Sequence, residues 1–246
     1  MVGFVLVSIL AIVALVAFAL RKKQTAGEVA ETESISYTVD CKRQDIAFYW
    51  QDDNGRAVRS IGNLKRFVER ENRKLVFAMN GGMFNADNSP TGLFIQNRKT
   101  LCPLNTASGR GNFYLKPNGV FYITTDGVPN ICKTQDFTDS SNVKYATQSG
   151  PMLVVDGKIH ASFKADSKSV NIRNGVGILP DGKVMFAISK TEVNFYGFAD
   201  FFRKSGCRNA LYLDGFVSRM YLPERNWLQT DGDFGVMIVV TEAIEK

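Results

Sequence analysis

Histidine is almost absent from this chain, and the shortage limits the chemistry that can be expected of it. His160 is the single histidine among 246 residues, so any mechanism that needs an imidazole as acid or base would have to use that side chain. No motif of a Ser-His-Asp triad surrounds it, and the chain has no G-x-S-x-G sequence to present a nucleophilic serine. The sequence therefore predicts no serine hydrolase. A packing role and a general-acid role both stay open for His160.

Cysteine is sparse as well, and its spacing excludes the common metal and redox motifs. Cys41, Cys102, Cys132 and Cys207 are too far apart for any CxxC-type site. In an exported domain they could form up to two disulfides with three possible pairings, whereas in the cytoplasm they would remain thiols. No motif calls for a metal or an organic cofactor.

The chain also lacks internal repeats and a concentrated basic surface. Its composition is 45% hydrophobic and 22% charged, which fits one globular domain. Three of the charges behind the formal net charge of +6 belong to Arg21, Lys22 and Lys23. No clustered basic stretch with interleaved aromatic residues is visible, so nucleic acid is not an expected partner. The modest positive balance is compatible with an anionic substrate.

The first hydrophobic run is long enough to cross a membrane. Residues 2–20 contain no charge and are followed at once by Arg21-Lys22-Lys23. As a helix this run covers about 28 Å, close to the hydrocarbon thickness of about 30 Å. No basic residue precedes the run and no clear cleavage site follows it, which favours an uncleaved anchor over a signal peptide. We therefore expect an anchor or signal segment at 1–23, a polar linker at 24–36 and one domain at 37–246.

Within that domain the patterns predict an α+β fold with a mainly antiparallel sheet, several hairpins and a few packed helices. Periodicity indicates helices at 61–72 and 195–205, the second closed by Gly206. Expected strands lie at 37–39, 46–51, 74–79, 209–213 and 234–241. Turn residues predict three hairpins, which join 113–115 to 120–124, 152–155 to 158–160, and 176–179 to 184–188.

Four glycine-marked blocks punctuate the domain in a fixed order. They are Asn80–Phe84 (NGGMF), Ser149–Pro151 (SGP), Arg173–Gly177 (RNGVG) and Leu213–Ser218 (LDGFVS). Three of them directly follow an apolar, β-rich run. A polar side chain where a strand gives way to glycine lies at the sheet edge, with its backbone open to a ligand. We therefore expect the four blocks to converge on one pocket.

Single residues in these blocks carry groups that could bind or act on a ligand. Asp214 ends an apolar strand, and Arg173 carries a planar guanidinium that can give a phosphate two hydrogen bonds. The side chain of Asn80 could orient a hydroxyl or phosphate, and the amides of Gly81 and Gly82 could form an anion-binding concavity. For each position a plain turn or surface role is the competing interpretation.

The ordered set of blocks resembles the phosphodiester glycosidase family, whose pattern reads roughly N-A/G-G-F-F, S-G-P, R-small-G and L-D-G-G-G-S. The resemblance spans about residues 74–240 and implies a hydrolase that cleaves a sugar phosphodiester, with Asp214 and Arg173 as catalytic residues. It also implies a glycan or sugar-phosphate substrate and no cofactor. Implied substrate-binding residues are Asn80, Gly81, Gly82, Ser149, Gly150, Asn174, Gly215 and Ser218.

Phe216 and Val217 depart from this pattern, because they stand where the family usually has two more glycines. The departure leaves substrate identity open, and it leaves a second interpretation in place. A non-catalytic carbohydrate- or envelope-binding module could be built on the same fold.

The two lines of evidence on orientation conflict. Basic residues directly after the span favour a cytoplasmic domain, whereas the family resemblance implies export to the periplasm, cell surface or lumen. We expect an exported domain that is held at the membrane by residues 2–20.

Overall fold

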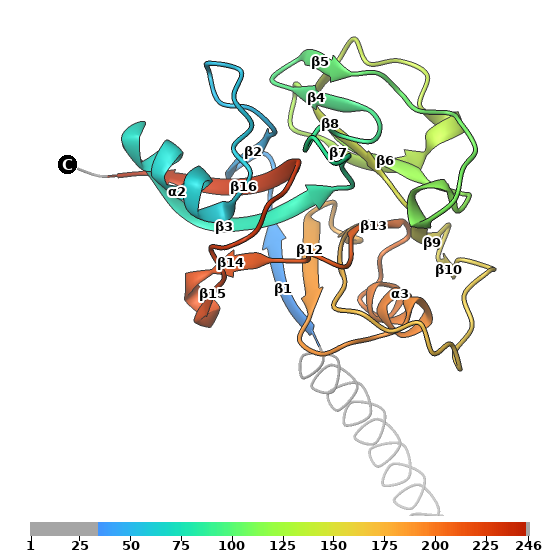
Figure 1. Ribbon diagram of the computed structural model, residues 1–246. Coiled ribbons are helices and arrows are strands. Elements are labelled where there is room, and N and C mark those ends of the chain that lie inside the picture. Colours follow the sequence, from blue (N-terminus) through green and yellow to red (C-terminus); the bar gives the residue numbers. More distant parts are fainter. Residues whose placement is uncertain (1–33, 245–246) are drawn as a thin grey trace, which may run out of the picture.

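The computed structural model describes residues 34–244 (Figure 1). The expected membrane segment at 2–20 lies outside the described residues. Between residues 34 and 244 no helix is both long and apolar enough to cross a membrane. Strand β1 begins at Ser34, so the first sheet takes in the last three residues of the predicted linker.

Three antiparallel sheets form the domain. The first has the order β1 (Ser34–Val39), β12 (Val184–Ser189), β11 (Asn174–Ile178), β13 (Ala210–Asp214), β9 (Met152–Val155), β10 (Lys158–Ile159). The second has the order β15 (Trp227–Leu228), β14 (Met220–Leu222), β3 (Arg73–Gly82), β16 (Val236–Ala243), β2 (Asp45–Tyr49). The third has the order β5 (Lys99–Cys102), β4 (Phe94–Gln96), β8 (Val143–Ser149), β6 (Gly119–Thr124), β7 (Pro129–Lys133). The predicted α+β class is confirmed, with three sheets in place of one.

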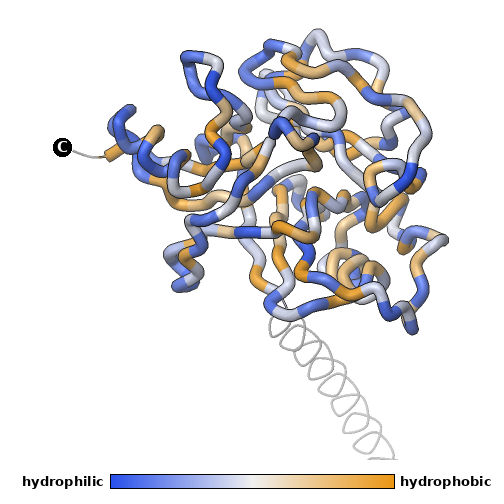
Figure 2. The backbone as a smooth tube through the Cα atoms, in the orientation of Figure 1, coloured by the Kyte–Doolittle hydropathy of each residue, from blue (hydrophilic) through white to orange (hydrophobic). Residues whose placement is uncertain are grey.

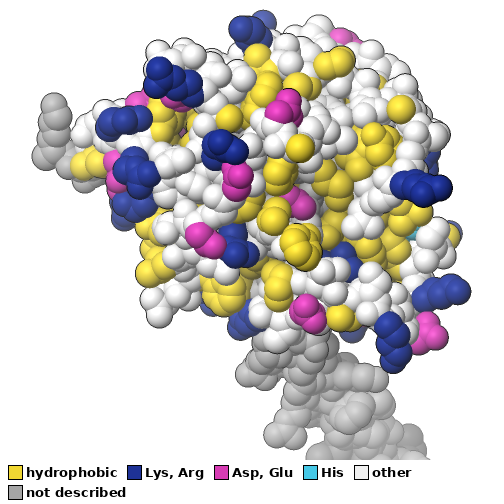
Figure 3. All heavy atoms as spheres, viewed as in Figure 1, with side chains coloured by type: hydrophobic (Ala, Val, Ile, Leu, Met, Phe, Trp, Pro, Cys, Tyr) yellow, Lys and Arg dark blue, Asp and Glu magenta, His cyan; other side chains and the backbone are white. Residues whose placement is uncertain are grey.

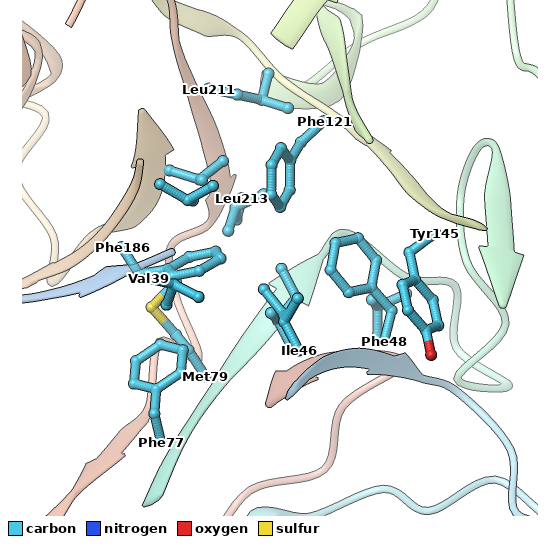
Figure 4. Packing of buried hydrophobic residues seen from close by; sticks show 14 of the residues in the cluster. Val39, Ile46, Phe48, Phe77, Met79, Phe121, Tyr145, Phe186, Leu211 and Leu213 are labelled. Atoms are coloured by element: carbon cyan, nitrogen blue, oxygen red, sulfur yellow. The ribbon is translucent and has the colours of Figure 1, made fainter. Parts of the chain in front are cut away.

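The main core lies where the three sheets meet. Phe121 of β6 packs against Phe48 of β2 at 5.4 Å between ring centroids and against Phe186 of β12 at 5.8 Å. Phe77 of β3 stacks on Phe186 from the other side at 5.2 Å, and Figure 4 shows these rings turned toward one another with Leu213 of β13 beside them. Hydrophobic stretches follow the strands in Figure 2, whereas hydrophilic stretches lie mostly in connections and on α2. The sheets are therefore held together by one shared aromatic cluster.

Each helix is set by a side-chain cap at its N-terminus and by one apolar face. Helix α2 (Ile61–Arg70) begins after Ser60, whose hydroxyl accepts a hydrogen bond from the Asn63 N–H at 3.1 Å. Helix α3 (Phe195–Lys204) begins after Asn194, whose side chain accepts from the Gly197 N–H at 2.9 Å. Gly206 follows α3 with a φ of 89°, the left-handed conformation expected after a helix end. Both predicted helices are confirmed.

Two of the three predicted hairpins are present, β9 with β10 and β11 with β12. The third was wrong, because residues 112–114 form a short 3-10 helix, η1 (Asn112–Tyr114), and β6 pairs with β7 and β8. The Asn118 side chain donates to the Phe113 carbonyl at 2.9 Å, which occupies an acceptor that a strand ladder would have needed. Two further 3-10 helices, η2 (Thr134–Asp136) and η3 (Pro223–Arg225), complete the elements.

Candidate active site

The first glycine block begins inside a strand, and only its last two residues lie beyond the strand end. β3 continues through Asn80 to Gly82 and pairs with β16 along this stretch. A Cβ atom on Gly81 would lie 2.6 Å from Ile238, and one on Gly82 would lie 2.5 Å from the Thr147 hydroxyl of β8. These glycines therefore allow close packing within the second sheet and against the third. The predicted loop with an anion-binding concavity is not what the structure shows.

Asn80, Asn174 and Asp214 meet in a buried hydrogen-bond network. The Asn174 amide donates to the Asn80 main-chain carbonyl at 2.8 Å and to the Asn80 side-chain oxygen at 2.9 Å. The Asn174 side-chain oxygen accepts from the Asp214 main-chain N–H at 2.8 Å, and the Asn80 amide donates to Asp214 Oδ2 at 3.2 Å. The network joins β3 of the second sheet to β11 and β13 of the first, so three of the four blocks contribute a residue to it.

Burial and hydrogen bonding act in opposite directions on the pKa of the Asp214 carboxyl. Its residue is 9% exposed, and Oδ1 accepts from the Gly215 main-chain N–H at 2.7 Å. Burial raises the pKa of Asp214 to about 6, while the Gly215 and Asn80 donors act in the opposite direction. A carboxylate can accept about four hydrogen bonds, and these two donors leave part of that capacity for water or substrate.

Two serines fix the main chain on either side of this carboxyl. Ser149, the last residue of β8 (third sheet), donates its hydroxyl proton to the Leu213 carbonyl at 2.7 Å. Ser218 donates in the same way to the Asp214 carbonyl at 2.9 Å. Both serines are buried, so in this arrangement their hydroxyls hold the backbone. Gly150 has a related role, since a Cβ there would lie 2.6 Å from the Asn118 side chain.

Arg173 lies beside the network but does not present its guanidinium to solvent. The residue is 1% exposed, and its side chain donates to the carbonyls of Val193 at 2.8 Å and Ser169 at 3.0 Å. The guanidinium also stacks on Phe195 at 3.7 Å. Burial lowers the pKa of Arg173 from its usual value. The prediction of an open phosphate clamp does not match this enclosed cation.

Tyr212 connects Arg173 to the network, and the sequence interpretation missed it. Arg173 Nη1 donates to the Tyr212 hydroxyl at 3.1 Å, and a Cβ on Gly215 would overlap that same hydroxyl. Burial raises the pKa of Tyr212 to about 12, so the phenol is neutral at physiological pH. The strand pattern could have identified Tyr212. Residues two apart in a strand lie on the same side of it, and Tyr212 precedes Asp214 by two.

His160 lies apart from these residues in a packing role. One ring nitrogen accepts from the Ser162 N–H at 3.1 Å, and the other is 3.1 Å from the Lys116 carbonyl. Its ring stacks on Phe163 at 4.7 Å. With both nitrogens bonded to main chain, the imidazole is not available as a general acid in this arrangement.

The cysteines and acidic groups offer no further site. All four cysteines are free thiols. Over the part of the chain that the structure describes, no group of three or more His, Cys, Asp or Glu side chains could hold a metal ion.

Comparison with known proteins agrees with this architecture. A sequence model described as phosphodiester glycosidase matches residues 73–241, a range that contains all four glycine blocks. The Escherichia coli (strain K12) protein named "Uncharacterized protein YigE" is 38% identical over 188 residues, which cover 76% of this chain and 73% of that protein.

Two solved structures share the fold at low identity. The zebrafish N-acetylglucosamine-1-phosphodiester alpha-N-acetylglucosaminidase catalytic domain, auto-inhibited by its pro-peptide, superposes with a TM-score of 0.55 at 17% identity, covering 85% of this chain and 88% of that one. A putative exported protein from Burkholderia pseudomallei K96243 superposes with a TM-score of 0.54 at 10% identity, covering 84% and 73%.

Proposed function

Because the chain belongs to the phosphodiester glycosidase family, we propose that it is a hydrolase that cleaves a sugar from a phosphodiester, with Asp214 as its central catalytic group. The observation that carries the proposal is the buried Asp214 carboxyl, whose pKa is raised to about 6. A titratable group perturbed in this way, with directed donors from Gly215 and Asn80, is typical of functional sites.

The chemistry of the proposed substrate suits a site with one carboxyl. Glycosidases commonly use a second, protonated carboxyl to help an alkoxide leave. A phosphate leaves already stabilised, since its second pKa is about 6, so the need for a strong general acid is smaller. Asp214 in its ionised form would activate water or stabilise the positive charge that develops at the sugar's anomeric carbon. Hydrogen bonds from Gly215 and Asn80 favour that ionised form and fix the direction of the carboxylate.

Arg173 has an indirect role in this scheme. Its guanidinium reaches the site through the Tyr212 hydroxyl and is held on the other side by two main-chain carbonyls. We assign it as a positioning residue that orients Tyr212 against Gly215 and adds positive potential where the phosphate would lie. A charge buried at low dielectric acts over a longer range than one on the surface.

The test is the pH dependence of hydrolysis of a phosphodiester of N-acetylglucosamine 1-phosphate, the bond that the zebrafish enzyme's name specifies. With Asp214 acting in its ionised form, kcat/KM should rise with pH through about 6 and then level off. Asp214→Asn should reduce kcat by about 10²-fold or more, while Asp139→Asn, a matched change at an exposed aspartate, should leave it unchanged. Full turnover by Asp214→Asn would overturn the assignment.

A non-catalytic carbohydrate-binding module is the second candidate, and one observation favours it. The polar groups of the network are buried and largely bonded to one another, an arrangement that holds a fold as well as a site. Binding of the same phosphodiester by the unmodified protein without release of sugar would support the module.

We also propose that the domain is exported and tethered by residues 2–20. The uncharged run, the polar segment that follows it and the family membership support this proposal. Protease added to spheroplasts should then degrade the domain, and protection until lysis would indicate the cytoplasmic orientation that Arg21, Lys22 and Lys23 favour.

A further inference from the structure

The turn that follows Asp214 is fixed at both ends by the network. The Ser218 N–H donates to the Gly215 carbonyl at 3.0 Å, closing a four-residue turn. The Ser218 hydroxyl holds the Asp214 carbonyl, and the Arg219 N–H donates to the Asn80 side-chain oxygen at 2.9 Å. Residues at the middle of the turn are therefore presented on a rigid support.

The two central residues of this turn point to different environments. Val217 is partly buried against the apolar cluster that includes Phe234 and Met237. Phe216 is 92% exposed, whereas no other large hydrophobic side chain of the described residues exceeds 55%. Neither residue has a positive φ, so replacing the family's glycines causes no backbone strain here. The most exposed large hydrophobic side chain of the described residues thus stands on the turn that directly follows the candidate catalytic carboxyl.

We propose that Phe216 is the specificity-determining contact of this site and stacks on the apolar face of a sugar ring of the substrate. This inference rests on the proposed function. Phe216 follows Asp214 by two residues, so the Cα atoms of the two lie at most about 7 Å apart and the ring stands on the turn that leaves the candidate catalytic carboxyl. Aromatic side chains commonly orient ligands in this way, because a flat apolar ring offers a large contact area at a fixed angle.

The size of the exposed surface favours a sugar over a protein partner. The flanking Gly215 and Ser218 are buried, so the turn exposes one ring and the edge of Val217, whereas a stable protein interface buries about 800 Å² per partner. On the face shown in Figure 3, acidic and basic side chains are scattered around apolar surface near its centre. The contact area that one exposed aromatic ring offers is about the size of one sugar ring.

The test compares Phe216→Ala and Phe216→Tyr with the unmodified full-length protein. Val128→Ala is the control, because Val128 is an exposed apolar residue next to the β6–β7 turn, at the end of β6 away from Ser149. The probe is the methyl phosphodiester of N-acetylglucosamine 1-phosphate, with turnover followed by sugar release and binding by calorimetry. We expect Phe216→Ala to lower kcat/KM and affinity about five- to tenfold, mainly through KM. Phe216→Tyr should keep kcat/KM and affinity near those of the unmodified protein, and Val128→Ala should change neither quantity.

The outcomes separate this inference from the proposed function. Equal affinity and equal kcat/KM in Phe216→Ala and the unmodified protein would overturn the stacking role while leaving hydrolysis intact. Binding that depends on Phe216 without any sugar release would sustain the stacking role and overturn the hydrolase. Neither binding nor turnover by the unmodified protein would overturn both for this sugar.

Discussion

Replacing Asp214 by asparagine should change how the stability of the protein depends on pH. The carboxyl is buried, and its pKa in the folded protein is about 6 against an ordinary value of 3.8. The folded state therefore binds the proton more tightly than the unfolded state does. The contribution of Asp214 to stability is fully present below about pH 3.8 and is lost as pH rises through about 6.

The size of the effect follows from the separation of the two pKa values. At about 1.4 kcal/mol for each pH unit, raising the pKa from 3.8 to about 6 corresponds to about 3 kcal/mol. Asparagine has no proton to lose in this range. The free energy of unfolding of the unmodified protein should thus fall by about 3 kcal/mol relative to Asp214→Asn between pH 3.5 and pH 7.5.

Urea unfolding of both proteins at several pH values measures this difference directly. Asparagine alters some hydrogen bonds at every pH, and this shifts the stability of the variant by a constant amount. The test of burial is therefore how the difference in free energy of unfolding between the two proteins changes with pH. Asp139→Asn controls for the substitution itself, since the pKa of this exposed carboxyl is lowered by its bonds to Ser141 and its effect has the opposite sign. A difference between unmodified protein and Asp214→Asn that stays constant from pH 3.5 to 7.5 would refute the reasoning.

Three further predictions concern two residues near this carboxyl and the N-terminal cap of α3. Arg173→Lys should lower the free energy of unfolding by about 3 kcal/mol, because one ammonium cannot replace three directed hydrogen bonds and a stacked guanidinium; a urea midpoint equal to that of the unmodified protein would contradict the enclosed arrangement. Gly215→Ala should cost about 1–3 kcal/mol through overlap with the Tyr212 hydroxyl, and adding Tyr212→Phe should recover part of that loss, whereas strictly additive losses would exclude the contact. Asn194→Ala should cost about 1 kcal/mol by removing the cap of α3, and thermal unfolding at an unchanged temperature would show that the cap contributes nothing.

Local patterns in the sequence were sufficient to predict both helices and two hairpins. The α2 pattern combines apolar residues at helical spacing with a serine cap, and each correct hairpin joins its strands through an Asp-Gly pair. These patterns involve residues close together in the chain, so they can be recognised without knowledge of the tertiary structure. The hairpin predicted at 113–115 failed because of another local interaction, in which the Asn118 side chain donates to the Phe113 carbonyl five residues earlier. Turn residues alone do not reveal this hydrogen bond.

The sequence predicted which residues lie together in the candidate site better than it predicted how deeply they are buried. The glycine blocks that contain Asn80, Ser149, Arg173 and Asp214 do lie close together, because hydrogen bonds connect them to one another or to residues beside them. Their burial could not be read from the sequence, because a polar residue beside glycine is usually found in an open turn. Here the glycines allow close packing, so β3 continues through Asn80 and the sheets approach each other.

The cost of keeping Asp214 buried argues for function over a purely structural role. At neutral pH the ionised carboxylate at this position costs about 3 kcal/mol relative to its protonated form. The amide side chains of Asn80 and Asn174 supply the neighbouring donors and acceptors of the network. Natural proteins retain such local instability mainly where activity requires it. The one carboxyl among these amides is therefore the group that we expect to carry out the chemistry.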